Sequence, residues 1–443
     1  MFANAIYLLA LTFASPWILY RRFRHGRYRR GFGQKFLGLG KQQAAVLRSD
    51  KSRCVWVHAV SVGEVNLLPD LVQRLQATDV DLQIVISSST DTGYDLAVKH
   101  FGADRVFFCP LDFTWTVTRT LKHLQAERLV LTELELWPNL IAAAHQLGCP
   151  VTVVNARLSE KSSSGYQRFS FLTKSTFAKL DCVACQDQST ADNFAACGTL
   201  GRNIHVTGSL KFDGAPQSRN TPQVRQCQQW AGIQPDHQVW LVGSTQVEEE
   251  TLALKTYQSL RQEHHALRLI IVPRHPERFQ AVAEMIASFG MKIQRRSIDE
   301  APLSESQWTN DTVILIDTVG ELRHWWGVCQ IATVGGSFGD RGGQNMLEPA
   351  GYGCAVSFGP NTRNFKDIAN RLIQAGGAVR VHDQAQLKDF VVTCLTDSSA
   401  TRLLGHAASQ MVNEHRGAID RTMQLLVASE NKNPLAAATT AAA

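Results

Sequence analysis

The sequence lacks the features that mark several common protein classes. Its ten cysteines follow no regular spacing, which argues against a disulfide framework and fits a reducing compartment. No His-rich set and no DxD motif follows a predicted strand, so we predict no metal and no cofactor. Basic residues are not spread along the chain, because six arginines fall between Arg21 and Arg30 and the remainder is close to neutral. Nucleic-acid binding, which needs a broad basic face, is therefore the least expected function.

One cysteine pair has the CxxC spacing of metal and redox motifs. Cys182 and Cys185 lie in an apolar run, residues 181–186, with no second pair and no histidine close by in the sequence. Small thiols in such a run behave as buried apolar side chains. We therefore predict that both cysteines are buried in a strand.

The first 20 residues contain no charged side chain. A helix over the nineteen that follow Met1 would be about 28 Å long, close to the thickness of bilayer hydrocarbon. Trp17 and Tyr20 lie at one end, and the arginines follow rather than precede the run, unlike a secretory signal. We predict a membrane anchor over residues 1–20 that spans a membrane and keeps the rest of the chain at its cytoplasmic face, with the arginines on anionic lipids. Because Pro16 interrupts the run, a helix lying in the interface is the alternative.

Short apolar runs alternate with helical patterns along the remaining chain. Near-continuous apolar runs are typical of parallel strands buried on both faces, so the alternation predicts two Rossmann-like, doubly wound α/β domains facing a cleft. A Pro/Gly/Ser-rich linker, 213–223, separates domains over 21–212 and 224–428, and an alanine-rich stretch, 429–443, is predicted to be a disordered tail. The predicted strands are 55–60, 82–89, 105–110, 128–133, 151–156, 181–186 and 204–208, then 239–245, 267–274, 313–318, 331–336 and 354–360.

Carboxylates follow two strands of the first domain, at the sheet edge where ligands of open α/β sheets bind. Glu64 comes after the first strand at the start of a helix, so it can be a capping charge or a general base. Glu133 and Glu135 follow the fourth strand and would point the same way on an extended segment. The alternative is that one of them caps the next helix and the other is solvated.

The second domain carries residues suited to a nucleotide. Arg274, at a strand end, can hold a phosphate or pair with Glu277, and Gly320 precedes a helix whose N–H groups can seat a phosphate. Asn345 and Glu348 share a helix face and lie among seven glycines between residues 335 and 353. Such glycines form simple turns or allow the backbone to close over a ligand.

Seven motifs in order (HAVSVGE, ELELWPN, NARLS, GSLKFD, VPRHPERF, DTVGEL and GGQNMLEPA) resemble those of the 3-deoxy-D-manno-octulosonic acid (Kdo) transferases. The resemblance covers roughly residues 20–425. It implies the GT-B glycosyltransferase fold and transfer of Kdo from CMP-Kdo to a lipid A precursor in lipopolysaccharide synthesis. It also implies an inverting, metal-independent reaction.

The resemblance assigns roles residue by residue. It implies that Glu64 is the general base and that Glu133 and Glu135 lie on the acceptor side. It implies a donor site for the cytidine monophosphate part of CMP-Kdo, made by Arg274, Gly320, Asn345 and Glu348, with Lys211, Ser209 and Ser337 as additions.

The chain departs from the family pattern in the donor domain. Gln246 stands where a histidine is common, and Gln344 and Met346 replace residues of a common GGHNPLE. Two alternatives therefore accompany this interpretation. One is another GT-B transferase or 2-epimerase-like enzyme with a uridine diphosphate donor, and the other is a non-catalytic scaffold at the membrane surface.

Overall fold

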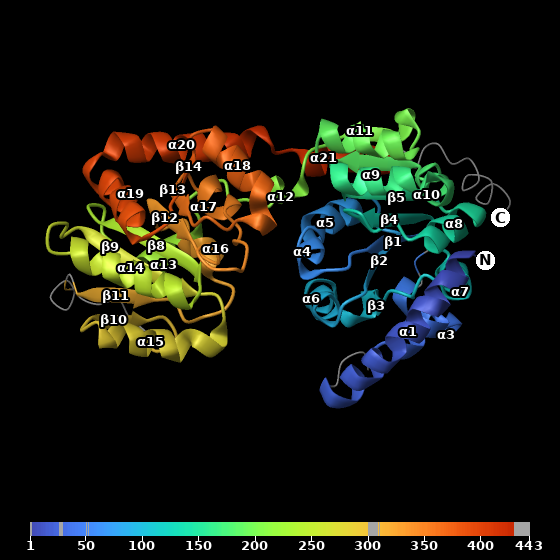
Figure 1. The fold of residues 1–443 in the computed structure, drawn as a ribbon, viewed down its shortest axis with the longest axis horizontal. Helices are drawn as coiled ribbons and strands as arrows, with labels where there is room; N and C mark the ends of the chain where they lie inside the picture. Colours follow the sequence, from blue (N-terminus) through green and yellow to red (C-terminus); the bar gives the residue numbers. More distant parts are fainter. Residues whose placement is uncertain are drawn as a thin grey trace. The chain divides into compact units, whose positions relative to one another are not determined.

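The computed structural model describes residues 2–25, 30–49, 51, 53–299, 309 and 311–428. The chain divides into two compact units: unit 1 is Met1–Gly214 with the C-terminal residues from Arg416, and unit 2 is Ala215–His415. Within the described residues each unit holds one seven-stranded parallel sheet with helices around it (Figure 1). The predicted class, two doubly wound α/β domains, is confirmed. The predicted tail, 429–443, and residues 26–29 of the arginine-rich stretch lie outside the described residues.

The sheet of unit 1 has the strand order β3-β2-β1-β4-β5-β6-β7. Chain order reverses between β1 and β4, which pair directly, His58 opposite Leu131. This reversal is the topological switch point, where open α/β sheets bind ligands beyond the carboxyl ends of their strands. The strands are β1 (Arg53–His58), β2 (Leu82–Ser88), β3 (Val106–Phe108), β4 (Arg128–Thr132), β5 (Val151–Ala156), β6 (Cys182–Cys185) and β7 (Ile204–Val206).

Helices cover both faces of this sheet because its side chains alternate between two apolar clusters. Trp56 of β1 packs in one cluster, while Val55 and Val57 pack in the other. Cys182 and Cys185 are buried free thiols on β6, as predicted. The helices are α1 (Phe2–His25), α2 (Phe32–Leu37), α3 (Lys41–Arg48), α4 (Val62–Val65), α5 (Leu68–Thr78), α6 (Asp91–Phe101), α7 (Thr114–Leu124), α8 (Pro138–Gln146), α9 (Glu160–Arg168), α10 (Ser170–Phe177), α11 (Gln188–Cys197), α12 (Leu210–Asp213) and α21 (Ala418–Ala428).

Unit 2 repeats the arrangement with the order β10-β11-β9-β8-β12-β13-β14, and its switch point lies between β8 and β12. Its strands are β8 (Gln238–Thr245), β9 (Leu267–Pro273), β10 (Lys292–Arg295), β11 (Thr312–Leu315), β12 (Ile331–Val334), β13 (Ala355–Phe358) and β14 (Ala378–Arg380). Its helices are α13 (Pro222–Trp230), α14 (Val247–Leu260), α15 (Phe279–Ser288), α16 (Leu322–Trp325), α17 (Leu347–Gly351), α18 (Lys366–Gln374), α19 (Gln384–Thr396) and α20 (Ser398–Glu414).

The boundary between the units, after Gly214, falls inside the predicted linker, but the second domain does not extend to residue 428. The last described helix, α21, belongs to unit 1. The Asp213 carboxylate accepts hydrogen bonds from the backbone N–H groups of Gly417 (2.6 Å) and Ile419 (2.7 Å). Ile419 is also buried in the second apolar cluster of unit 1, so packing of α21 returns the chain to the first domain.

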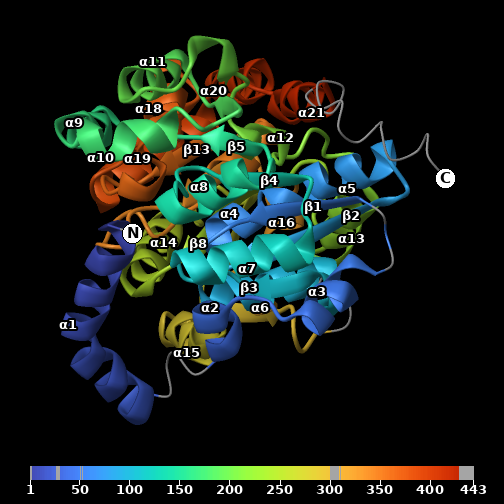
Figure 2. The same cartoon turned by 90° about the vertical axis from the view of Figure 1, so that its right-hand side faces the viewer.

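The predicted N-terminal helix is present as α1, which carries Pro16 within it. Asn4 Nδ2 donates to Thr114 Oγ1 on α7, and Figure 2 shows α1 leaving the body of unit 1 beyond its first turns. Among the described residues, no helix combines the length and the apolar character needed to cross a membrane, so the predicted span is not supported. Polar side chains such as Thr12 and Ser15 lower the apolar character of the run.

Candidate active site

Glu64 lies at the switch point of unit 1, just beyond the carboxyl end of β1. Its carboxylate accepts hydrogen bonds from Val60 N (2.9 Å), Ser61 Oγ (2.8 Å) and Thr132 Oγ1 (2.7 Å). The residue is only 8% exposed, and Ser61 caps α4 by accepting from the Glu64 N–H. The carboxylate is therefore held in one position by the turn it follows and by the last residue of β4.

The two following carboxylates do not lie on an extended segment, so that expectation is wrong. Glu133 has a left-handed φ of 51°, and Glu135 N donates to Thr132 O across the turn this creates. Glu135 accepts a hydrogen bond from Trp137 Nε1 (3.0 Å). Burial, followed by the negative charge of Glu64, raises the pKa of Glu135 to about 7. The carboxyl groups of Glu64 and Glu135 therefore lie close enough to interact electrostatically at the switch point.

Lys211 lies in unit 1, not with the other predicted donor residues. Its ammonium nitrogen is 3.5 Å from Glu133 Oε1. Ser209 also belongs here, because Asn155 Oδ1 accepts hydrogen bonds from Ser209 Oγ (3.3 Å) and Leu210 N (3.0 Å). The structure thus brings Glu133 close to the start of the GSLKFD motif. The sequence alone did not predict this contact.

Sequence reasoning missed His58, the last residue of β1. It is fully buried, its Nδ1 lies 2.9 Å from Ser87 Oγ, and burial lowers its pKa to about 4. The imidazole is therefore neutral beside Glu64. The signal was a histidine within an otherwise apolar strand that runs directly into the SVGE turn.

In unit 2, the glycine-rich loop after β12 is filled by a side chain of the same unit. Backbone N–H groups of Gly336, Ser337 and Phe338 donate to the Glu249 carboxylate at 2.7, 2.8 and 3.0 Å. A Cβ at Gly335 would lie 2.7 Å from Glu249 Oε2, so glycine is needed there for this contact. These glycines therefore serve an internal carboxylate, which sequence reasoning missed.

Ser337, predicted as an addition to the donor site, has its side chain inside unit 2, and its donor role stays a prediction. It is fully buried, its hydroxyl donates to Val334 O (2.6 Å) and its oxygen accepts from Gly359 N (2.8 Å). Of the departures from the family pattern, Met346 is fully buried. Gln246 Nε2 is a buried donor that has no hydrogen-bond partner in the described part of the chain.

Asn345 and Glu348 pair as their spacing predicts, with Asn345 Nδ2 donating to Glu348 Oε1 at 3.2 Å. Burial raises the pKa of Glu348, and the positive charges of Arg323 and Arg274 oppose that rise. Arg274 is therefore close to Glu348, and within the described residues it makes no ion pair with Glu277.

Gly320 follows the carboxyl end of β11 with φ of 93°, and a Cβ there would meet no atom within 4 Å. The adjacent Glu321 accepts hydrogen bonds from Arg296 Nε (3.0 Å) and Thr318 Oγ1 (2.8 Å), which fix the turn. The backbone at Gly320 thus faces open space. Unit 2 therefore carries cationic and amide groups suited to a phosphate, and unit 1 carries a fixed carboxylate, each within its own unit.

The family model and the relatives in sequence agree on one family. The family model described as 3-deoxy-D-manno-octulosonic-acid transferase (kdotransferase) matches residues 27–214. The 3-deoxy-D-manno-octulosonic acid transferase of Haemophilus influenzae is 33% identical, covering 84% of this chain and 86% of the relative. The enzyme of that name from Bordetella pertussis is also 33% identical, covering 96% and 98%. A crystal structure of UDP-N-acetylglucosamine 2-epimerase covers 86% of this chain and 98% of its own with a TM-score of 0.53; at 12% identity it shows the fold alone.

Proposed function

Because the chain belongs to the 3-deoxy-D-manno-octulosonic acid transferases, a family of glycosyltransferases, we propose that it moves Kdo from CMP-Kdo to a lipid A precursor. The observation that carries the mechanism is the Glu64 carboxylate, fixed by three hydrogen bonds at the switch point of unit 1. A carboxylate held there has lost the freedom to reorient, which favours proton transfer from a bound hydroxyl.

In the proposed reaction the acceptor hydroxyl gives its proton to Glu64. The hydroxyl oxygen forms a bond to the anomeric carbon of Kdo, and the bond from that carbon to the phosphate oxygen breaks, so that CMP leaves with the electron pair. Attack on the face opposite the leaving group inverts the anomeric centre, through an oxocarbenium-like transition state. Arg274 stabilises the charge that develops on the departing phosphate.

The donor site proposed in unit 2 consists of Arg274, Gly320, Asn345 and Glu348. The Glu348 carboxylate can accept from both hydroxyls of a ribose, and Asn345, which already donates to it, orients the oxygen atoms. Lys211 stays a proposed donor contact. The acidic pair Glu133 and Glu135 is proposed to line the acceptor side.

We also propose that α1 binds the cytoplasmic face of the inner membrane as an interfacial helix. Phe13, Trp17 and Tyr20 are 85%, 51% and 60% exposed, and the Arg21 guanidinium carbon lies 4.5 Å above the Trp17 ring. Aromatic rings and arginines on a helix surface suit the headgroup region of an anionic bilayer. Flotation with anionic vesicles tests this: Phe13→Ser with Trp17→Ser should weaken binding, and unchanged flotation would contradict it.

The proposed function is tested by a transfer assay with CMP-Kdo generated in situ and a tetra-acylated lipid A precursor, in detergent and with EDTA, read by product mass. Glu64→Gln should lower the rate by at least about 10²-fold. The matched control is Glu160→Gln, which removes an exposed carboxylate of the same unit and should leave transfer unchanged. CMP and UDP compared as competitors distinguish the proposed donor from a uridine diphosphate sugar. Transfer at the wild-type rate by Glu64→Gln would refute the proposal that Glu64 is the general base.

A further inference from the structure

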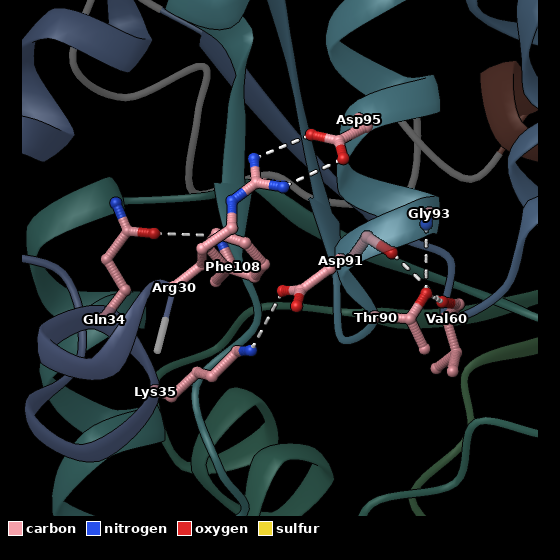
Figure 3. Close-up of polar contacts among 10 residues, drawn as sticks. Arg30, Gln34, Lys35, Val60, Thr90, Asp91, Gly93, Asp95 and Phe108 are labelled. Carbon is pink, nitrogen blue, oxygen red and sulfur yellow. Dashed lines mark hydrogen bonds and ion pairs between the residues drawn. The ribbon is translucent and has the colours of Figure 1, made fainter. Parts of the chain in front are cut away.

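The segment that follows α1 is fastened to the body of unit 1 by Arg30. The guanidinium group donates to both carboxylate oxygens of Asp95 on α6, at 2.9 and 2.7 Å (Figure 3). It also lies over the rings of Tyr94 and Phe108, 5.2 and 5.7 Å from their centroids. Arg30 thus attaches the chain to α6 and β3.

Lys35 and its neighbours extend this attachment. Its ammonium nitrogen lies 4.3 Å from the Phe108 ring centroid and 3.9 Å from Asp91 Oδ1, and Phe108 N donates to Gln34 Oε1 at 2.8 Å (Figure 3). At Gly31, where φ is 65°, a Cβ would lie 2.2 Å from the same ring. Residues 30–35, which we call the brace segment, are therefore shaped to close onto Phe108 and the first turn of α6.

Thr90, the N-cap residue of α6, holds Val60, which lies four residues before Glu64. Thr90 Oγ1 donates to Val60 O (2.8 Å) and accepts from Gly93 N (3.1 Å), and Ser88 Oγ also donates to Val60 O (3.1 Å) (Figure 3). The N–H of Val60 in turn donates to Glu64 Oε2. A Cβ at Gly93 would lie 2.9 Å from Val60 O, so this close approach of helix and turn needs glycine.

We propose that Thr90 is a positioning residue for Glu64, and that the brace segment holds the helix that carries Thr90. Val60 contributes its carbonyl to Thr90 and its N–H to the base, so the orientation of this residue sets where the carboxylate lies. Loss of the Thr90 hydroxyl leaves the carbonyl with one donor and lets the turn rotate. This inference rests on the proposed role of Glu64 as general base.

The first test compares Thr90→Val with Thr90→Ser in the full chain. Valine keeps the shape and removes the hydroxyl, whereas serine keeps the hydroxyl. Thr90→Val should lower kcat about tenfold, since small displacements of a catalytic group are costly, with KM for CMP-Kdo changed less than about twofold. Thr90→Ser should recover most of the rate. A normal kcat in Thr90→Val, or a loss shared by Thr90→Ser, would overturn the proposal.

A double-mutant cycle separates positioning from a general structural defect. If Thr90 acts through Glu64, adding Thr90→Val to Glu64→Gln should leave the residual rate unchanged within about twofold. A second tenfold loss in the double variant would mean that Thr90 acts on folding or elsewhere, and the proposal fails. If Glu64→Gln alone transfers at the wild-type rate, the general-base proposal fails first, and that outcome is distinct.

The brace segment is tested with Arg30→Met, which keeps the aliphatic stem and loses the pairing with Asp95. In detergent, kcat should fall about threefold, a change that corresponds to the interaction free energy of an exposed ion pair. Binding to anionic vesicles should stay unchanged. Weaker vesicle binding with an unchanged kcat in detergent would show that Arg30 serves the membrane and would overturn the brace.

Discussion

Glu64 is near enough to Glu135 for its negative charge to oppose ionisation of the Glu135 carboxyl group. Burial is the larger cause of the raised pKa of Glu135, and Trp137 opposes it by a hydrogen bond. Near neutral pH Glu135 therefore exchanges a proton while the neighbouring imidazole of His58 stays uncharged, because burial lowers the pKa of that group to about 4.

This raised pKa makes stability depend on pH with a definite sign. The native state binds the Glu135 proton more tightly than the unfolded state, so this group costs stability as pH rises from about 4.5 to about 7. Glu135→Gln removes that cost. The Tm of the variant minus the Tm of the wild type should therefore be about 2 °C larger at pH 8 than at pH 5. Thermal unfolding at both values measures it, with Glu160→Gln as the control. Equal differences at the two values would contradict a raised pKa.

The Glu249 carboxylate accepts four backbone hydrogen bonds, one from Gln246 N and three from the loop after β12. Glu249→Gln points an amide N–H₂ at N–H donors and should destabilise unit 2 by about 3 kcal/mol. The loss of stability is measured by urea unfolding, with hydrogen exchange of the β8 and β12 amides as the readout for unit 2. Glu248→Gln, at the exposed neighbouring position, is the control and should change little. A stable Glu249→Gln variant would show that the loop keeps its shape without the carboxylate.

At the scale of elements, short helices are fixed by side chains from distant parts of the chain. Asp112 accepts from the N–H groups of Asn139 (3.0 Å) and Leu140 (2.7 Å), at the start of α8, and so holds the segment after the acidic pair. The hydroxyl of Tyr7 on α1 donates to the same carboxylate at 3.0 Å. The N-terminal helix therefore docks on the cap of α8.

The docking of α1 gives a prediction about its exchange with solvent. Tyr7→Phe removes the hydrogen bond to Asp112 and keeps the ring that meets Phe113 edge-on, with centroids 6.2 Å apart. Amide exchange in the first turns of α1 should accelerate about fivefold, the equivalent of one hydrogen bond. Exchange in β1 is the internal reference and should not change. Unaltered exchange in α1 would mean that ring packing alone holds the helix.

At the scale of the whole molecule, unit 1 is built from both ends of the chain. Ile419, Met423 and Leu426 of α21 are buried in the same apolar cluster as α5 and β1. Ending the chain at His415 removes these side chains and should destabilise unit 1 by about 5 kcal/mol, while CMP binding by unit 2 persists. Amide hydrogen exchange in β1 and β4 reports the stability of unit 1, and exchange in β8 and β9 reports that of unit 2. A chain ending at residue 428 is the control, and equal protection in both chains would contradict this role of α21.

Most of the strands could be predicted from the sequence, and the two that were missed share a physical reason. β10 (KIQR) and β14 (AVR) lie at the two edges of the second sheet, where a strand has one neighbour and needs no continuous apolar run. The location of Glu64, Glu133 and Arg274 just after strands could be predicted because strand ends are visible in the pattern of apolar runs. Glu249 was missed because nothing local shows that a carboxylate in one βα segment will fill a loop 87 residues later.

The sequence by itself determined the α/β class, the division into two domains and the family, since alternation, turn residues and motif order are local properties. Tertiary structure alone decided that Ser337 is buried, that Glu249 fills the loop after β12 and that the last helix returns to the first unit. These outcomes depend on which side chains complete a buried hydrogen-bond set or an apolar cluster. That choice is made between segments far apart in the chain, where packing and desolvation outweigh local preference.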